Sequence, residues 1–446
     1  MRCAPILAVT FALAGLGVVP DAEASPEDIF SYGARSPAMG GTGAASAVGF
    51  DATYANPALL SRLRERKLTL GLQTATFALH ADGEGLPGPV PTKPAKGVVI
   101  GVDLPVPFGG VLENRVGLGF AFYTPTDVIV RGRLLYPETP QYPLLPDRTQ
   151  SLMIRAGAGV DVGYGFRVGA GFAALAEITG SAVVATDATG RVGTRVEDQL
   201  IATYALAGGI TYDLPLKNEG KVRVGVSYRG TLDARFLVAI DATKLSTLNI
   251  PVLNIAGLAQ YDPAQVAVEV ARETGNLTLA LGATYKRWSR YPGPLEPTIQ
   301  CSAENADCGA LKPAKIEYED VVALHTGVDY GIAAARGMTA HVRGGLLFEP
   351  NPLPKRVPTS QAYDRAADAA VDVPTRYFNA TRLAITWGGG LELAKPLPPL
   401  NLDLYGQYHV LLPYDHESIA RDGTTAPLGR ASGHVLVGGL LVGVRF

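Results

Sequence analysis

The chain has 446 residues, a formal net charge of -2 and only 18% charged residues, with a mean hydropathy of +0.15. The near-neutral charge, without a basic cluster, speaks against a nucleic-acid partner. Beyond the N-terminus, no run of about 18 apolar residues could form a membrane-spanning helix. The apolar residues must therefore be distributed in alternation, as they are in strands.

Residues 1–24 have the pattern of a signal peptide, which is removed from the mature protein. Arg2 precedes an apolar stretch over residues 6–19, and the sequence Ala-Glu-Ala at 22–24 is a small-residue cleavage site. The alternative is a short anchor helix, but the stretch is shorter than the roughly 20 residues that a spanning helix needs. We therefore expect an exported protein that begins at Ser25.

Residues 25–66 show no sustained alternation of apolar and polar residues. Gly41 and Gly43 lie in a glycine-rich part, and Asn56, Pro57 and Ala58 open an apolar turn. A segment of this size buries too little surface to fold alone, so we expect it to pack against a larger body. The two glycines also resemble part of a nucleotide-binding loop, but no strand precedes them and no third glycine follows at the required spacing.

Three short motifs in this segment, taken in their order, resemble the N-terminal hatch of FadL-type outer-membrane transporters. They are residues 33–35 (Gly-Ala-Arg), 39–43 (Met-Gly-Gly-Thr-Gly) and 51–58, which end in the Asn-Pro-Ala turn. In that family a hatch plugs a fourteen-stranded barrel that carries long-chain fatty acids, aromatic hydrocarbons or other hydrophobic compounds inward. The resemblance implies that residues 25–66 are the hatch, with gating residues Gly41, Gly43, Asn56, Pro57 and Ala58.

From residue 67 to residue 446, bulky apolar residues alternate with small or polar ones. In residues 433–446, for example, one row is apolar and the other combines glycines with Arg445, which is the pattern of a membrane β-barrel strand. The predicted fold class is all-β, a transmembrane antiparallel β-barrel of about 14 strands with the hatch (plug) inside its lumen. The strands are expected near 67–79, 98–104, 115–130, 150–163, 166–186, 198–213, 221–241, 263–271, 276–290, 318–330, 338–350, 379–394, 400–412 and 433–446.

Connections after odd-numbered strands are mostly long, and those after even-numbered strands are mostly short. Long outer loops and short periplasmic turns are typical of an outer-membrane barrel. We therefore expect the protein in the outer membrane of a Gram-negative cell, as a monomer, with the N-terminus and the C-terminus in the periplasm. The expected partners are outer-membrane lipids and, because the terminal Phe446 is similar to the signal read by it, the barrel-assembly machinery. Closure of the barrel explains Phe446 equally well.

Aromatic residues near the segment ends are typical of the girdles at membrane interfaces. They are Tyr123, Tyr228, Tyr285, Trp288, Tyr330 and Trp387.

The sequence offers little for catalysis. The six histidines are scattered, and neither the His-Glu-x-x-His nor the Gly-x-Ser-x-Gly motif occurs. We expect no enzyme, no catalytic residue, no metal site and no cofactor. Ser432 and His434 would be the active-site residues of an outer-membrane lipid hydrolase, but a polar strand end explains them equally well.

Cys301 and Cys308 are the only cysteines after the signal peptide. Their polar surroundings favour a small disulfide loop in an oxidising compartment, with free thiols or a metal half-site as alternatives.

Two features suggest a path for an apolar ligand. Residues 243–260, expected as an outer loop, would expose an apolar patch, and such patches usually mark binding surfaces. The alternative is that the loop packs on itself over the barrel mouth. The proposed capture residues are Leu245, Leu248, Ile250, Val252, Leu253, Ile255 and Leu258.

Pro125, between Thr124 and Thr126 in the third strand, lacks the amide hydrogen that the ladder needs. The resemblance implies a kink there that opens the wall to the side. The alternative is that Pro125 lies beyond the paired part of the strand.

Inward-facing arginines could bind a carboxylate headgroup through charge-assisted hydrogen bonds, and the candidates are Arg155, Arg229 and Arg343. Pairing with lumen carboxylates is the favoured alternative. The leading hypothesis is a passive, hatch-gated transporter of hydrophobic compounds such as long-chain fatty acids, with lateral exit as one route. The alternatives are a structural or adhesive barrel without transport and the lipid hydrolase.

Overall fold

The alternating segments fold into strands that close into a barrel. The computed structural model describes residues 26–126, 137–146, 152–186, 192–216, 220–244, 253–299, 313–364 and 369–446. Fourteen antiparallel strands form the wall. In order around the barrel they are β1 (Lys67–Asp82), β3 (Ala95–Pro105), β4 (Val116–Pro125), β5 (Met153–Gly163), β6 (Phe166–Thr186), β7 (Val192–Leu216), β8 (Gly220–Arg229), β11 (Gln265–Thr274), β12 (Leu277–Lys286), β14 (Val321–Ala335), β15 (Met338–Glu349), β19 (Arg382–Leu393), β20 (Leu400–Ile419) and β21 (Thr425–Arg445).

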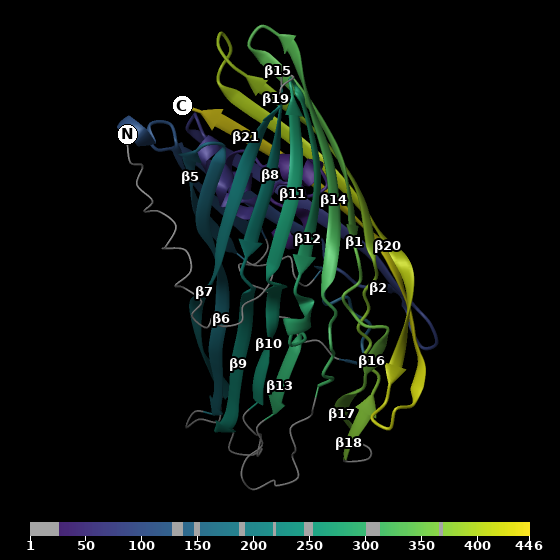
Figure 1. The fold of residues 1–446 in the computed structure, drawn as a ribbon. Helices are drawn as coiled ribbons and strands as arrows, with labels where there is room; N and C mark the ends of the chain where they lie inside the picture. Colours follow the sequence, from purple (N-terminus) through teal and green to yellow (C-terminus); the bar gives the residue numbers. More distant parts are fainter. Residues whose placement is uncertain are drawn as a thin grey trace, which may run out of the picture.

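The last strand closes the barrel against the first. β21 pairs with β1 without a register shift, from Lys67 opposite Arg445 to Asp82 opposite Arg430. Phe446 continues this ladder, since its amide donates to the carbonyl of Arg66 at 3.1 Å. We call the end of the barrel at which Phe446 lies the near rim, and the opposite end the far rim (Figure 1).

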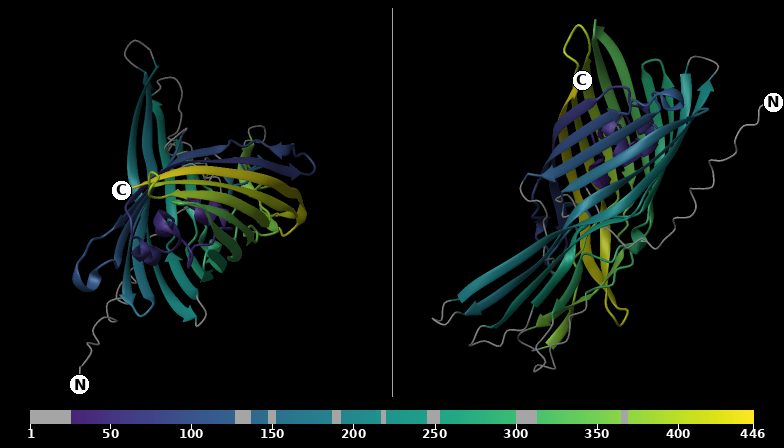
Figure 2. Two further views of the ribbon diagram at one scale, coloured as in Figure 1. Left: turned by 90° about the horizontal axis from the view of Figure 1, so that it is seen from above. Right: turned by 90° about the vertical axis from the view of Figure 1, so that its left-hand side faces the viewer.

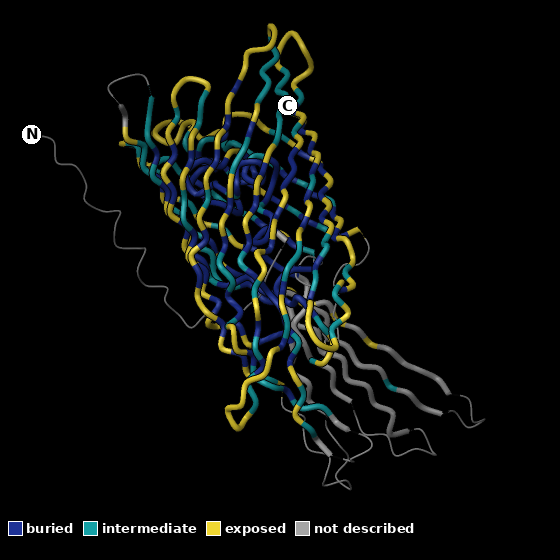
Figure 3. The backbone as a smooth tube through the Cα atoms, turned by 90° about the vertical axis from the view of Figure 1, so that its right-hand side faces the viewer, coloured by how far each residue is buried: buried dark blue, intermediate teal, exposed yellow. Residues whose placement is uncertain are grey.

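The outer surface of the wall is apolar. In β21, Leu436 and Leu440 are exposed while Val437 and Leu441 are buried inside, and the same alternation recurs along the wall strands (Figure 3). An extended belt of exposed leucine, valine and aromatic side chains is stable next to lipid, as in transmembrane barrels. Among the described residues, no helix is long and apolar enough to cross a bilayer.

The N-terminal segment lies inside the barrel towards the near rim, as the views from two further sides also show (Figure 2). We call residues 26–66 the plug. The plug contains α1 (Pro26–Phe30), α2 (Arg35–Ala38), η1 (Gly49–Asp51), α3 (Ala52–Ala55) and η2 (Pro57–Arg62). Asn56 caps η2 because its side chain accepts a hydrogen bond from the amide of Ala58, and proline fits the first position of the helix.

Three strands extend the wall beyond the far rim. They are β9 (Leu232–Lys244), β10 (Leu253–Asp262) and β13 (Leu295–Ile299). β9 pairs in parallel with β6 and antiparallel with β10, which in turn pairs with β13. The smaller elements are β2 (Gly88–Val90), η3 (Gly110–Leu112), η5 (Trp288–Arg290), β16 (Arg356–Pro358), β17 (Ser360–Asp364) and β18 (Ala369–Val373).

The predicted fold class is confirmed, but two local predictions are wrong. Residues 221–241 form two strands, because the ladder between β7 and β8 ends at Arg229 and β9 joins β6 instead. Part of the expected loop 243–260 is strand β10, because its backbone finds partners in β9 and β13.

Four of the six aromatic residues expected in the girdle face outward. Tyr228, Tyr285, Tyr330 and Trp387 are exposed on the outer face. Tyr123 and Trp288 instead lie buried inside the barrel. Tyr123 belongs to the inward row of β4, and Trp288 lies in η5, where the chain leaves the wall after β12.

Candidate functional site

The plug packs against inward-facing glycines of the wall. Asn56 is fully buried, and its amide group donates to the carbonyl of Ala44 at 2.6 Å. A Cβ atom on Gly209 of β7 would lie 2.0 Å from Oδ1 of Asn56, which no side chain can accommodate without movement. Glycine is therefore required at this point of the wall.

The same close approach recurs around the barrel. On Gly225, a Cβ atom would lie 2.0 Å from the carbonyl oxygen of Ala44. Equivalent contacts, all below 3 Å, join Gly159 to Pro57, Gly169 to Ala58, Gly327 to Met39, Gly345 to Gly40 and Gly388 to Ala38. The plug backbone from Ala38 onward is thus packed against β5, β6, β7, β8, β14, β15 and β19. We call the seven wall glycines named in these contacts the glycine bed.

Gly41 and Gly43 lie at two polar anchors of the plug. The carboxylate of Glu269 in β11 accepts hydrogen bonds from the amides of Gly43 at 2.5 Å and Ala44 at 2.9 Å. Nδ1 of His325 lies 2.8 Å from the carbonyl oxygen of Gly40. Gly41 has a φ of 80°, a conformation that favours glycine. The anchor residue Glu269 was missed from the sequence, because nothing in its strand marks one inward carboxylate as special.

The first helix of the plug, α1, is held by buried charges. Nζ of Lys286 lies 3.1 Å from Asp28 and 2.8 Å from Glu349. Arg382 donates to the other oxygen of Glu349 and, at 3.2 Å, to the carbonyl of Ile29. These contacts join α1 to β12, β15 and β19.

The three arginines proposed as carboxylate partners all contact groups of the protein. Arg155 and Arg229 lie on the ring of Tyr54, 4.8 Å and 4.2 Å from its centre, an arrangement stabilised by cation–π attraction. Arg229 also donates to Gln265 at 2.6 Å. Arg343 donates to Asp403 at 2.6 Å. Their geometry is that of structural pairs.

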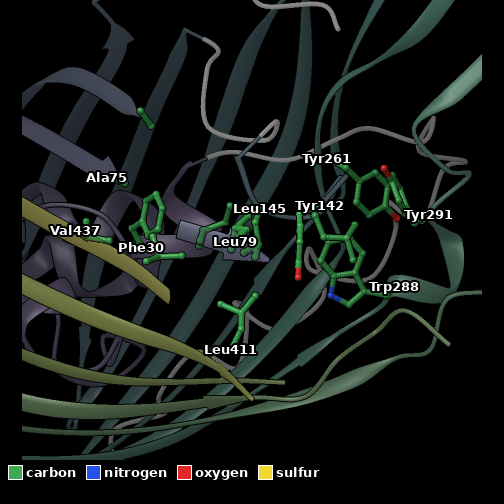
Figure 4. Close-up of a cluster of buried hydrophobic side chains, with 14 of the residues drawn as sticks. Phe30, Ala75, Leu79, Tyr142, Leu145, Tyr261, Trp288, Tyr291, Leu411 and Val437 are labelled. Atoms are coloured by element: carbon green, nitrogen blue, oxygen red, sulfur yellow. The ribbon is translucent and has the colours of Figure 1, made fainter. Parts of the chain in front are cut away.

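On the far-rim side of the plug, the lumen is largely apolar. Four aromatic side chains pack together there, with ring centres 4.6 Å apart for Tyr261 and Tyr291, 4.6 Å for Tyr291 and Tyr318, and 5.5 Å for Tyr261 and Trp288. Phe30 of the plug and the wall residues Leu79, Leu411 and Val437 belong to the same buried cluster (Figure 4). We call this region the chamber. Barrel lumens are normally polar, so an apolar one requires a reason.

The chamber is filled by residues 137–146, which we call the inner segment. Its backbone is tied to residues 376–378 by three hydrogen bonds of 2.7 to 3.0 Å, involving Pro137 and Gln141. Tyr142, Leu144 and Leu145 are buried in the cluster. The free cavity beside Leu144, Leu145 and Trp288 is only about 20 Å³, room for one water molecule. This segment was not predicted from the sequence, although its apolar residues lie in a stretch with proline at 137, 140, 143 and 146.

On the near-rim side of the plug, by contrast, lies a polar vestibule of about 460 Å³. Its lining includes Arg62, Lys67, Glu273, Asp329, His341 and Arg343. The plug therefore separates an apolar compartment from a charged one.

Asp51 of the plug is buried beside this vestibule, and burial raises its pKa from 3.8 to about 7. Lys67 opposes the rise, while Asp103 and Asp403 add to it. The amide of Ser36 donates to Oδ2 of Asp51 at 3.4 Å. At neutral pH the plug thus holds a carboxyl group close to its titration point.

Replacing Asp51 by asparagine should flatten the pH dependence of stability. Because the folded pKa lies above the unfolded one, the stability contributed by the protonated carboxyl is complete below about pH 4 and is lost as the pH rises through 7. The parent should lose up to about 4 kcal/mol of unfolding free energy over this range, and Asp51→Asn should not. Urea titrations in detergent at several pH values measure this; parallel pH profiles for both proteins would rule it out.

The remaining sequence-predicted site residues lie at the end of β4, in β10 or outside the described structure. Pro125 is the last residue of β4 and still pairs with Gly97, while the amide of Thr126 donates to Lys96 at 3.0 Å. Leu253, Ile255 and Leu258 lie in β10, beyond the wall. Outside the described residues are the signal peptide, Leu245, Leu248, Ile250, Val252, Cys301 and Cys308.

No protein-family model and no curated protein sequence matches the chain. Its structure matches the crystal structure of a Pseudomonas aeruginosa FadL homologue with a TM-score of 0.60, over 96% of this chain and 99% of that chain, at 14% sequence identity. The chain has the FadL fold. The resemblance predicted from the plug motifs is thereby confirmed at the level of the fold.

Two further solved structures are similar to this FadL fold. The P. putida toluene transporter TodX matches with a TM-score of 0.52 and 15% identity, and the CymD monoaromatic hydrocarbon channel with 0.50 and 16%. Each alignment covers 93% of this chain and 98% of the other.

Proposed function

We propose that the protein is an outer-membrane channel that takes up small hydrophobic compounds. The apolar chamber is the observation that carries this proposal, because a lumen that passes only polar solutes has no use for buried aromatic rings such as Trp288, Tyr261 and Tyr291. The structural neighbours named as a toluene transporter and a monoaromatic hydrocarbon channel support it. The ligands in these names favour compact aromatic compounds as the substrates of this protein. Long-chain fatty acids are the other candidate class.

The proposed orientation places the far rim outside the cell and the near rim in the periplasm. A hydrophobic compound enters from the far rim, where the apolar residues of β10 guide it, and reaches the chamber by diffusion. The charged vestibule beneath the plug is a poor environment for an apolar molecule. This supports the side exit near Thr124, Pro125 and Thr126, where β4 ends.

We assign gating to α1, at the start of the plug. The body of the plug, with Gly43 and Asn56, is packed against wall glycines from Ala38 onward. α1 is held instead by the ion pair between Asp28 and Lys286 and forms part of the chamber boundary through Ile29 and Phe30. Movement of α1 opens the chamber at a smaller free-energy cost than displacement of the whole plug.

Uptake of radiolabelled toluene by Gram-negative cells tests the proposal. Cells that carry the protein in the outer membrane should accumulate toluene faster than cells with an empty vector. The second candidate is a structural barrel with a permanent plug, and the glycine bed is the one observation that favours it. Equal uptake with and without the protein, at a confirmed expression level, would support that second candidate.

A further inference from the structure

The Tyr142 side chain fills the chamber in the way a small ligand would. It is buried, and its ring lies 6.2 Å from that of Phe378. It enters from the inner segment, which is no part of the wall, so the pocket around it is formed by β1, β21 and residues near Phe378. A free aromatic molecule of the same size would meet the same surroundings.

The Tyr142 hydroxyl is bound at the seam where the barrel closes. The amide of Ser432 in β21 donates to it at 3.0 Å, and it donates in turn towards the carbonyl of His80 in β1, at 2.5 Å. Ser432 and His80 are register partners in the closing ladder. The hydroxyl also lies 3.1 Å from the carbonyl oxygen of Ser432. The seam thus presents one backbone donor and two backbone acceptors to a single hydroxyl group.

These backbone groups select among ligands. A phenol offers both an acceptor and a donor at one oxygen, whereas toluene would leave the Ser432 amide and the His80 carbonyl without that partner, which is unfavourable when they are buried. A carboxylate has no hydrogen to donate to His80 and would lie against its carbonyl oxygen. Burial also raises the pKa of Tyr142, so the site favours a neutral hydroxyl over a phenolate.

We propose that the Tyr142 pocket is a binding site for small neutral phenols, and that Tyr142 is its tethered occupant in the empty channel. The proposal rests on the proposed function and deepens it, since it names hydroxylated aromatic compounds as a preferred class. A phenol that enters the chamber displaces Tyr142 and takes over its hydrogen bonds to Ser432 and His80. Gln141, bonded to residues 376 and 378, keeps the displaced residue close.

Tryptophan fluorescence can test the site, because the chain has two tryptophans. Trp288 lies buried beside the inner segment, and Trp387 is exposed on the outer wall. In a Trp387→Phe background, titration with p-cresol or toluene reports occupation of the chamber through Trp288. Tyr142→Ala removes the occupant, and Tyr142→Phe keeps its ring while removing only the hydroxyl.

We expect Tyr142→Ala to bind p-cresol roughly tenfold more tightly than the parent does. We also expect Tyr142→Ala to bind p-cresol roughly tenfold more tightly than it binds toluene. Tyr142→Phe should bind p-cresol with intermediate affinity, which keeps the test available if the alanine variant does not fold. Equal affinities for p-cresol and toluene, or no change on substitution, would overturn the phenol site while leaving hydrophobe uptake intact. Absence of binding of either compound to every variant would count against the chamber itself.

Discussion

Substitution of Gly209 by valine should detach the plug from the wall. A Cβ atom at this position would lie 2.0 Å from Oδ1 of Asn56, so the added side chain must displace a buried residue that holds Ala44 and Ala58 by hydrogen bonds. Overpacking together with the lost hydrogen bonds should lower the unfolding free energy of the plug by about 3 kcal/mol or more. Hydrogen exchange of residues 38–61 in the folded barrel measures this loss.

Gly208 supplies the matched control, because it is the preceding residue of the same strand. A Cβ atom on Gly208 would be 3.8 Å from the nearest atom, and its neighbours in the same row, Leu206 and Ile210, are exposed on the outer wall. Gly208→Val should leave the exchange of the plug unchanged. If the two valine variants exchange alike, the plug is not held by the glycine bed.

Substitution of Glu349 by glutamine should release α1. Glu349 is buried between Lys286 and Arg382, and its removal leaves two buried cations without their shared carboxylate. Breaking a buried ion pair from one side typically costs about 3 to 5 kcal/mol. We therefore expect Glu349→Gln to lower the unfolding free energy by about 3 kcal/mol and to expose residues 26–34 to protease. Urea titration and limited proteolysis measure the two effects.

Glu417→Gln is the control for charge alone. Glu417 pairs with Lys355 at 2.6 Å and Arg356 at 3.3 Å, but both cations are exposed. Exposed pairs contribute little to stability because water screens them, so this variant should be close to the parent. Should both glutamine variants behave alike, α1 is not held by the buried network.

The barrel could be predicted from the sequence because alternation is a local property. Each row of residues such as Leu436, Leu440 and Val444 identifies its own face, and the same pattern in Gly117 to Tyr123 indicated the inward row of β4. The number of strands then followed from the number of alternating segments. Even the inward position of Arg155 and Arg343 could be read in this way.

The chamber could not be predicted because it depends on contacts between distant segments. The inner segment has prolines instead of a period, and nothing local indicates that Tyr142 lies between β1 and β21. The partners of Arg343 depend on the register of β14, β15 and β20, which alternation does not fix. In the sequence, the wall glycines were visible only as a row of small residues. In the structure, each of them lies against the plug.

The FadL fold also changes what the plug motif means. Asn56, Pro57 and Ala58 were expected to take part in gating. In the structure they lie against Gly209, Gly159 and Gly169, where an added Cβ atom would come within 2.0 to 2.5 Å of them. This geometry supports a role in holding the plug, with the moving part at α1. The proposal remains that the plug gates the channel.

The central claim is that hydrophobic compounds pass through the apolar chamber. The most direct test is the initial rate of toluene uptake by cells that carry the parent, Leu411→Ser or Val410→Ser. Leu411 lies in the chamber, whereas Val410 is the preceding residue of β20 and faces outward. We predict that Leu411→Ser lowers the uptake rate roughly tenfold at low toluene concentration and that Val410→Ser does not. Equal rates for all three proteins at equal expression would contradict the claim.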